Sequence, residues 1–269
     1  MKKRKKRSHT GARLAIAAIM LYLMLPLVMT LVYSLFREWI DIAPKGFTLS
    51  AYTTLMADPI FLKAIGRTLV ISVVPILLCT VFLLLAMYVV VIYQPGWNKL
   101  IQVLCTIPYA IQGVILPVCV LSLYAKAPKP FSDRMFMLVA AYMIVILPYM
   151  YQGIRNNLNA VGATRMIEAA QMLGASRFYA FFGVVIPNIT GGIMISVMLS
   201  MAIVFGDFVI INTLAGGRFM TAQMYLYDVM KKSGQKTCAV IILLFLVTLL
   251  ISLTAFFMQS GGKKKKERK

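Results

Sequence analysis

Long apolar stretches separated by short polar segments dominate this chain of 269 residues. A run of about 20 apolar residues has the length that a helix needs to cross the hydrocarbon core of a membrane. The chain contains six such runs: Leu14–Phe36, Thr68–Tyr93, Leu100–Tyr124, Met135–Tyr151, Ile189–Ile211 and Cys238–Met258. The fourth is short. The pattern predicts an all-α integral membrane protein with six transmembrane helices.

Composition supports this prediction, since 61% of the residues are hydrophobic and the mean hydropathy is +0.84. Little chain remains outside the apolar runs, which excludes a soluble catalytic domain. We expect a single transmembrane domain over residues 14–260, between short basic tails at residues 1–13 and 261–269. The first apolar run is too long for a signal peptide and shows no small-residue cleavage site, so we interpret it as an uncleaved first helix.

The distribution of charge predicts the orientation in the membrane. The net charge is +20, and 17 of the 28 Lys and Arg residues lie in the two tails, at Lys99 or in the loop after the fourth run. Basic residues near spans accumulate on the cytoplasmic side. Both termini and the loop after the fourth run are therefore expected in the cytoplasm. The basic tails adjoin spans and lack interleaved aromatic residues, so they indicate contact with membrane lipid and no nucleic-acid binding.

A polar, helix-forming segment lies in this loop, at about residues 155–188. It contains Glu168-Ala169-Ala170, then Gly174, then Ile186-Pro187. Thr164 is a candidate N-cap, Glu168 is placed to favour the positive end of a helix, and Gly174 is suited to ending it. A small apolar face suited to a groove on a partner is expected from Ala169, Ala170 and Leu173. The same features also fit an amphipathic helix that lies along the membrane surface.

The spacing from Glu168 to Gly174 and Pro187 resembles the EAA loop of permease subunits in type I ABC importers, in which E-A-A-x(3)-G is followed by I-x-P or L-P. The resemblance covers roughly residues 50–260. In that family the loop is a short cytoplasmic helix, a glycine turn and a second helix that dock into a separate ATPase subunit. The resemblance implies an ATPase-coupling role for Glu168, Ala169, Ala170, Leu173, Gly174 and Pro187.

The resemblance also implies a fold and a function. The fold is the permease core of a type I ABC importer, with the coupling-helix loop between the fourth and fifth spans. The function is that of a permease in an ATP-driven, binding-protein-dependent importer of a small solute in the bacterial inner membrane. The partners implied are an ABC ATPase dimer, a second permease subunit, either homologous or identical, and an extracytoplasmic solute-binding protein.

The group of permeases that this chain resembles in detail handles spermidine and putrescine. The segment Gly206-Asp207-Phe208-Val209 and the later Gly216-Gly217 are similar to the stretch that follows the EAA loop in that group. A polyamine is therefore the expected solute. The same group includes permeases for 2-aminoethylphosphonate and ferric iron, which are the alternatives.

The sequence contains no G-x-x-x-x-G-K-[ST] phosphate-binding loop, so the chain is not expected to hydrolyse ATP. ATP and magnesium are expected on the partner ATPase subunit, and this chain is expected to bind no cofactor. The four cysteines fall in or at predicted spans without a C-x-x-C pair, and His9 is the single histidine, so no metal site is predicted.

Four polar residues are candidates for the translocation pathway. An ionisable group within a span is costly and is a functional candidate by default. Asp207 is such a group: it either contacts a cationic solute or pairs with Arg218 or a lysine such as Lys231. Hydrogen bonds to a solute are also available from Asn212, Tyr109 and Gln112. Polar side chains of this kind also join membrane helices to one another.

Two other classes of protein remain as alternatives on composition alone. An ion-coupled secondary transporter requires intramembrane acids or bases, for which Asp207 is the sole candidate. A membrane-bound enzyme requires a catalytic set at the membrane surface, and no paired carboxylates or His/Asp cluster are visible.

Overall fold

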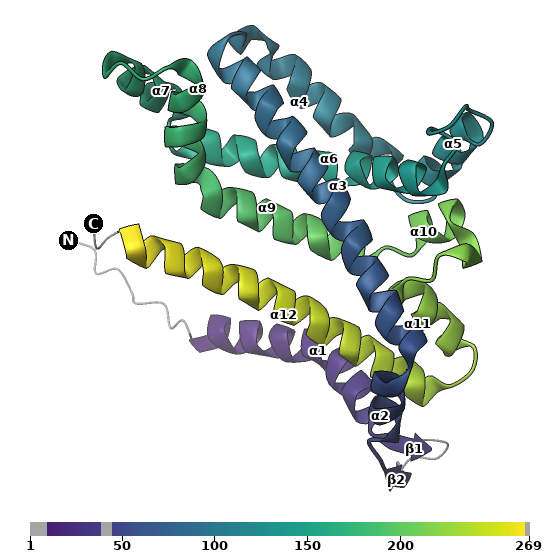
Figure 1. Cartoon of the computed structure of the whole chain (residues 1–269). Helices are drawn as coiled ribbons and strands as arrows, with labels where there is room; N and C mark the ends of the chain where they lie inside the picture. Colours follow the sequence, from purple (N-terminus) through teal and green to yellow (C-terminus); the bar gives the residue numbers. More distant parts are fainter. Residues whose placement is uncertain (1–9, 39–44, 267–269) are drawn as a thin grey trace. The chain divides into compact units, whose positions relative to one another are not determined.

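The computed structural model describes residues 10–38 and 45–266 (Figure 1). Most of the predicted N-terminal basic tail, including His9, and the last three residues lie outside this part. The described chain divides into two compact units. The first comprises Met1–Phe61 and Leu226–Leu246, and the second comprises Leu62–Tyr225 and Val247–Lys269.

The first unit begins with the apolar helix α1 (Thr10–Ser34). A short antiparallel hairpin follows, in which Phe36 of β1 (Phe36–Glu38) is paired with Phe47 of β2 (Lys45–Phe47). The next helix is α2 (Ser50–Ala57), and its Tyr52 hydroxyl is hydrogen-bonded to the Ser34 hydroxyl. Parts of two later helices complete this unit, from α11 (Ala222–Met230) and α12 (Gly234–Lys266).

The second unit is a helical bundle with a continuous apolar core. It holds most of α3 (Pro59–Ile92) and the helices α4 (Asn98–Thr106), α5 (Ile115–Tyr124), α6 (Arg134–Ala160), α7 (Ala163–Met172), α8 (Arg177–Tyr179), α9 (Ile186–Gly206) and α10 (Val209–Leu214). Short 3₁₀ helices are η1 (Pro95–Trp97), η2 (Ile107–Ile111) and η4 (Gly216–Arg218), and η3 (Ala180–Val185) is a π-helix.

Five described helices are long and apolar enough to cross a membrane, and a bent pair of helices makes up to six. The prediction of an all-α protein with six spans is thereby supported. The predicted fourth span proved too short, because α6 has 27 residues. Its start is fixed by Asp133, whose carboxylate accepts a hydrogen bond from the Met135 N–H at 2.9 Å, and its end extends through Arg155 to Ala160 beyond the apolar run.

The third predicted span, Leu100–Tyr124, is not one continuous helix. The first helical part runs through α4 and η2 to Ile111, and the second part, α5, begins at Ile115. The axes of these two parts are bent by 102°. Gly113 lies between them with φ of 80°, a left-handed conformation that glycine adopts without a steric cost. Broken helices in membranes occur where protein or a cavity, rather than lipid, surrounds the exposed backbone.

The fifth predicted span, Ile189–Ile211, also differs from the structure. The helical stretch from Arg177 ends at Gly206, and Asp207 adopts an extended conformation with ψ of 130° before α10 begins. Asp207 therefore lies just beyond the helix, in a break between two helical segments.

Helices α6 and α9 make the most extensive helix–helix contact of the second unit. Two glycines allow this close approach. A Cβ atom on Gly153 of α6 would lie 1.7 Å from the Ser196 hydroxyl, and one on Gly192 of α9 would lie 1.8 Å from the Asn157 side chain. The Asn157 amide also donates to the Gly153 carbonyl at 2.8 Å, and the Ser196 hydroxyl donates to the Gly192 carbonyl at 3.1 Å. Small residues at such crossings are typical of membrane helices.

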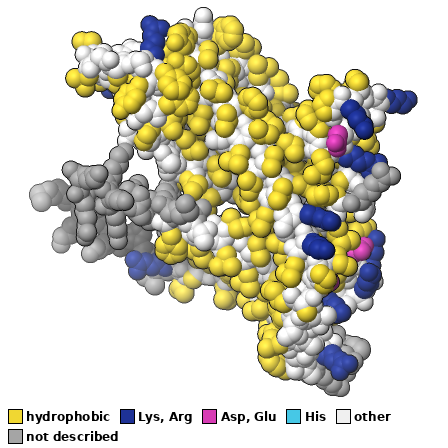
Figure 2. Space-filling view, in the orientation of Figure 1, with side chains coloured by type: hydrophobic (Ala, Val, Ile, Leu, Met, Phe, Trp, Pro, Cys, Tyr) yellow, Lys and Arg dark blue, Asp and Glu magenta, His cyan; other side chains and the backbone are white. Residues whose placement is uncertain are grey.

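The surface of the molecule is largely hydrophobic, as expected for contact with lipid. Figure 2 shows apolar side chains over most of the visible face, with Lys and Arg gathered in patches. Exposed aliphatic side chains occur along helices of both units, for example Leu21 and Leu77.

Candidate functional site

The connection between α6 and α9 lies at one end of this helix pair, and α10 lies at the other end (Figure 1). It consists of α7, a turn, the short α8 and the π-helical η3. We call residues 163–185 the α7–α8 segment. All of its helices belong to the second unit.

Helix α7 begins two residues earlier than the sequence-based prediction. Its N-cap is Gly162, with φ of 64°, and Thr164 is the second helical residue. The prediction of Thr164 as the N-cap was therefore wrong, and the cap uses no side-chain hydrogen bond. Glu168 is the sixth residue of the helix, beyond the first turn, so the expected benefit from the positive helix end does not apply.

The C-terminal end of α7 forms a Schellman turn around Gly174. The Gly174 N–H donates to the Gln171 carbonyl at 2.9 Å, and the Ala175 N–H donates to the Ala170 carbonyl at 3.0 Å. This pattern requires a left-handed residue, and Gly174 has φ of 86°. The position and role of this glycine in the turn match the sequence-based prediction.

The two residues before this turn project into solvent. Met172 is 89% exposed and Leu173 is 90% exposed. Helix α7 is fixed to the core through its other face, where Ala163, Ile167 and Ala170 are buried. The expected apolar face is therefore divided: Ala170 packs inward, whereas Ala169 and Leu173 are exposed. Met172 was missed because its exposure depends on how the helix is anchored.

After the turn, Ser176 begins the return helix, because its hydroxyl accepts a hydrogen bond from the Tyr179 N–H at 3.2 Å. The helix is π rather than α over Ala180–Val185. Pro187 accounts for the change in winding: it has no N–H for the carbonyl of Gly183, four residues earlier, and a wider turn avoids the clash with its ring. Pro187 thus shapes the path from the segment into α9.

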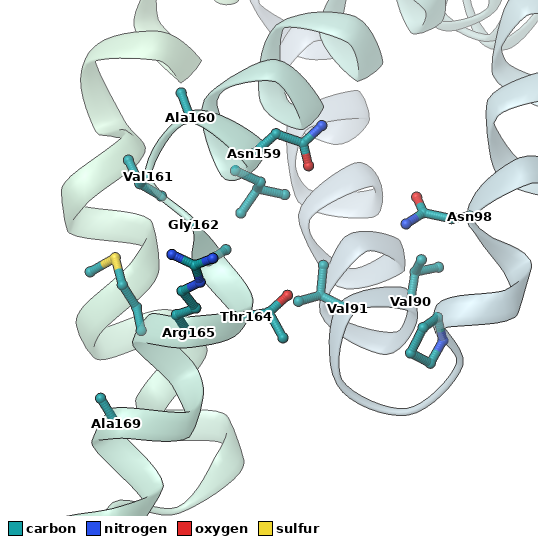
Figure 3. Close-up of a pocket in the computed structure, with 14 residues that line it drawn as sticks. Val90, Val91, Asn98, Asn159, Ala160, Val161, Gly162, Thr164, Arg165 and Ala169 are labelled. Carbon is teal, nitrogen blue, oxygen red and sulfur yellow. The ribbon is translucent and has the colours of Figure 1, made fainter.

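A polar hollow of about 830 Å³ opens beside α7 (Figure 3). Arg165, Thr164 and Asn159 line it on the side of α6 and α7, and Val90 of α3 and Asn98 of α4 lie across from them. Its lining mixes a cation, amides and a hydroxyl with apolar side chains. The hollow is therefore lined in part by groups that can form hydrogen bonds.

Two of the four predicted pathway residues come together at Tyr149 of α6. The Tyr109 ring packs edge-on against the Tyr149 ring with centroids 5.2 Å apart. The Gln112 amide nitrogen lies 3.4 Å from the Tyr149 hydroxyl, to which it donates. All three side chains are partly buried. The break in the third span is what positions Tyr109 and Gln112 against α6.

Asp207 is held by two hydrogen-bond donors. The Tyr142 hydroxyl donates to its carboxylate at 3.1 Å, and the Ile210 N–H donates to the same oxygen at 2.9 Å. The second bond satisfies a free N–H in the first turn of α10, as an N-terminal cap does. Of the two basic partners considered for this acid, the Arg218 side chain lies outside the described residues, and the Lys231 ammonium lies 4.1 Å from the Tyr227 ring centroid.

Asn212, the fourth predicted pathway residue, is exposed on α10. In the described part of the chain, no side-chain contact joins it to the Tyr109–Gln112 group or to Asp207. Sequence reasoning missed Tyr142 and Tyr149, which lie seven residues apart and so share a face of α6. That spacing of two tyrosines within an apolar run was the available signal.

The described residues contain no group of three or more His, Cys, Asp and Glu side chains that could hold a metal ion. The four cysteines are free thiols.

These features define a class: an integral membrane protein whose helical core carries an exposed, firmly anchored helix–turn–helix at one end and a broken span beside a polar group. The family follows from comparison with known proteins. Residues 68–261 match the family described as the binding-protein-dependent transport system inner membrane component. The chain belongs to this family, and it is a type I ABC importer permease.

Relatives at low identity are named for different solutes. The sulfate transport system permease protein CysW of Synechococcus elongatus is 26% identical over 71% of this chain and 72% of its own length. PhnV of Salmonella typhimurium, named for 2-aminoethylphosphonate transport, is 24% identical over 69% of each chain. The spermidine/putrescine permease PotB of Haemophilus influenzae is 19% identical over 75% of this chain and 76% of its own length.

A solved structure shares the fold. It is a bacterial ABC transporter involved in import of the acidic polysaccharide alginate, and it aligns with a TM-score of 0.66 over 94% of this chain and 97% of the matched chain. Sequence identity over this alignment is 14%, so the likeness concerns the fold alone.

Proposed function

We propose that the α7–α8 segment docks on a separate ABC ATPase, and that the chain passes a small solute across the membrane when that ATPase binds and hydrolyses ATP with magnesium. The observation that carries this proposal is the pair of nearly fully exposed side chains, Met172 and Leu173, on a helix otherwise anchored in the core. An apolar tip held rigidly in solvent is suited to a groove on a partner.

Leu173→Ser is expected to weaken recovery of the ATPase about tenfold, because it removes one exposed apolar side chain that the interface would bury. The measurement is the amount of ATPase that copurifies with the tagged chain from membranes. Leu123→Ser is the matched control, since Leu123 is also highly exposed, at 73%, but lies on α5. Equal recovery by the unmodified chain and Leu173→Ser would contradict docking through this tip.

The orientation follows from the charge distribution, and we propose that both termini and the α7–α8 segment lie in the cytoplasm. A cysteine at Met172 is expected to react with an impermeant thiol reagent only after the cells are permeabilised. A cysteine at Lys126, an exposed residue after α5, is expected to react in intact cells. The reverse labelling pattern would overturn this orientation.

The wider assembly is inferred from the family. A second permease subunit would complete the pathway, and an extracytoplasmic binding protein would deliver the solute. The structure does not favour the alternative of an ion-coupled secondary transporter. Its one candidate acid, Asp207, already accepts two hydrogen bonds at its carboxylate.

For the solute, we favour an anion of the phosphonate or sulfate type over the polyamine that the sequence suggests. The polyamine hypothesis relies on Asp207, and the hydrogen bonds from Tyr142 and Ile210 support a structural role for this acid instead. Near α10, the Arg134 guanidinium donates to the Ala215 carbonyl, and the exposed Lys126 and Lys129 follow α5, which contacts α10; these three side chains supply positive charge. CysW and PhnV are also named for anion-bearing solutes.

Asp207→Asn separates these hypotheses, because asparagine caps helices as well as aspartate but carries no charge. If the solute is an anion, solute uptake is expected to stay within about twofold of the unmodified rate, while Asp207→Ala lowers the free energy of unfolding by about 1–2 kcal/mol. Uptake and thermal melting measure the two effects. A large loss of uptake in Asp207→Asn with unchanged melting would favour the polyamine.

A further inference from the structure

The end of α3 is joined to the α7–α8 segment through a cluster of aromatic rings. The ring centroid of Tyr88, near the end of α3, lies 5.4 Å from that of Phe181, 5.6 Å from that of Phe182 and 6.0 Å from that of Phe178. The Phe178 and Phe182 rings are themselves 4.6 Å apart. Ring pairs at these separations attract one another beyond the burial of apolar area. The cluster therefore connects the two elements directly.

Arg177 contacts the exposed end of this cluster through Tyr93. Tyr93, the residue after α3, packs edge-on against Tyr88 with centroids 5.8 Å apart, and the two hydroxyl oxygens are 3.4 Å apart. The guanidinium carbon of Arg177 lies 5.3 Å from the Tyr93 ring centroid. This distance is within the range of a cation–π interaction, which arginine forms with the face of an aromatic ring.

Beside this cluster, α7 and the end of α3 line a common hollow, which Arg177 also borders. A cavity of about 170 Å³ lies between them, lined by Val91 and Ile92 of α3 and by Glu168 and Gln171 of α7. A hollow transmits less force than a filled contact because its lining atoms lack partners on one side. The ring cluster and Arg177 are therefore a direct contact through which this part of the segment is held to α3.

We propose that Arg177 and Tyr93 form a latch that positions the α7–α8 segment on the end of α3, so that movement of the segment is passed to α3. The consequence for transport rests on the proposed function, whereas the latch is a property of this chain alone. Arg177 is exposed and Tyr93 is 50% exposed, so their contact contributes little to global stability. Its effect is on local opening of the segment, which occurs at a lower free energy than unfolding.

Hydrogen exchange of the full chain in lipid nanodiscs tests the latch. Arg177→Gln and Tyr93→Leu are each expected to raise the exchange rates of backbone amides in residues 172–180 about threefold, while Tyr93→Phe, which keeps the ring and loses the hydroxyl, is expected to raise them less. Melting temperatures are expected to stay within about 2 °C of the unmodified chain. Phe219→Leu is the matched control, since the Arg67 guanidinium carbon also lies 5.3 Å from the Phe219 ring, near the start of α3.

Unchanged exchange in Arg177→Gln and Tyr93→Leu would overturn the latch. A second measurement uses the ATPase that copurifies with the chain: Tyr93→Leu, which lies outside the docking segment, is expected to keep ATPase recovery and basal hydrolysis but to lower solute-stimulated hydrolysis about threefold. Faster exchange with full stimulation would refute transmission to α3. If the unmodified chain retains no ATPase, the proposed function fails, and the exchange result still decides the latch.

Discussion

Gly174→Val is expected to leave the chain inserted in the membrane but to weaken ATPase recovery on the order of 100-fold. A branched side chain at φ of 86° is strained whatever the space around it, so the turn must open. Opening breaks the hydrogen bonds from Gly174 and Ala175 to α7 and displaces Met172 and Leu173 together. ATPase copurification and stimulated hydrolysis measure the loss.

Gly174→Asn is the control for this prediction, because asparagine tolerates the left-handed conformation better than other residues with a side chain. No atom lies within 4 Å of the Cβ position at Gly174, so the Cβ atom of neither substitution meets a neighbour. The asparagine variant is expected to retain at least about one third of the unmodified recovery. Equal loss in both variants would show that the backbone conformation is not the cause.

The second large effect is expected at the crossing of α6 and α9. Gly192→Leu is expected to destabilise the folded protein by about 3 kcal/mol or more, since its Cβ alone would lie 1.8 Å from the Asn157 side chain. The helices must separate or shift, and the hydrogen bond from Asn157 to Gly153 is lost. Yield of monodisperse protein and thermal melting in detergent measure this effect.

Two variants separate crowding from a general effect of replacing glycine. Gly206→Ala, at the last residue of α9, meets no atom within 4 Å and is expected to be nearly neutral. Gly153→Ala is expected to destabilise through the Ser196 hydroxyl, and adding Ser196→Gly is expected to restore part of the stability. A destabilised Gly206→Ala, or a double variant no more stable than Gly153→Ala, would count against crowding at this crossing.

Local signals in the sequence predicted the helical spans and the glycine turn. Apolar runs depend on composition over about 20 residues, and the turn at Gly174 depends on one residue and its immediate neighbours. Both are therefore visible without tertiary information. The N-cap at Gly162 was missed because Thr164 has the better capping side chain. In the structure the chain turns directly after α6, and the left-handed residue of that turn, Gly162, precedes α7.

Tertiary contacts account for the remaining differences. The break in the third span was missed because Gly113 is a single residue in an apolar run. Asp207 was noticed because an acid within a predicted span is unusual, but its donor Tyr142 lies on another helix and could not be deduced from spacing. The close contact of Gly153 with Ser196 is likewise visible only once α6 and α9 are packed.

The π-helical stretch Ala180–Val185 affects the orientation in which the exposed tip is presented to a docking partner. A π turn holds about one residue more than an α turn, so it acts as a one-residue insertion in an otherwise regular helix. Each residue of an α-helix advances the chain by about 100° around the axis. The number of residues in this π-helical stretch therefore sets the direction of Leu173 around the axis of α9. This number matters as much as the side chains of the tip itself.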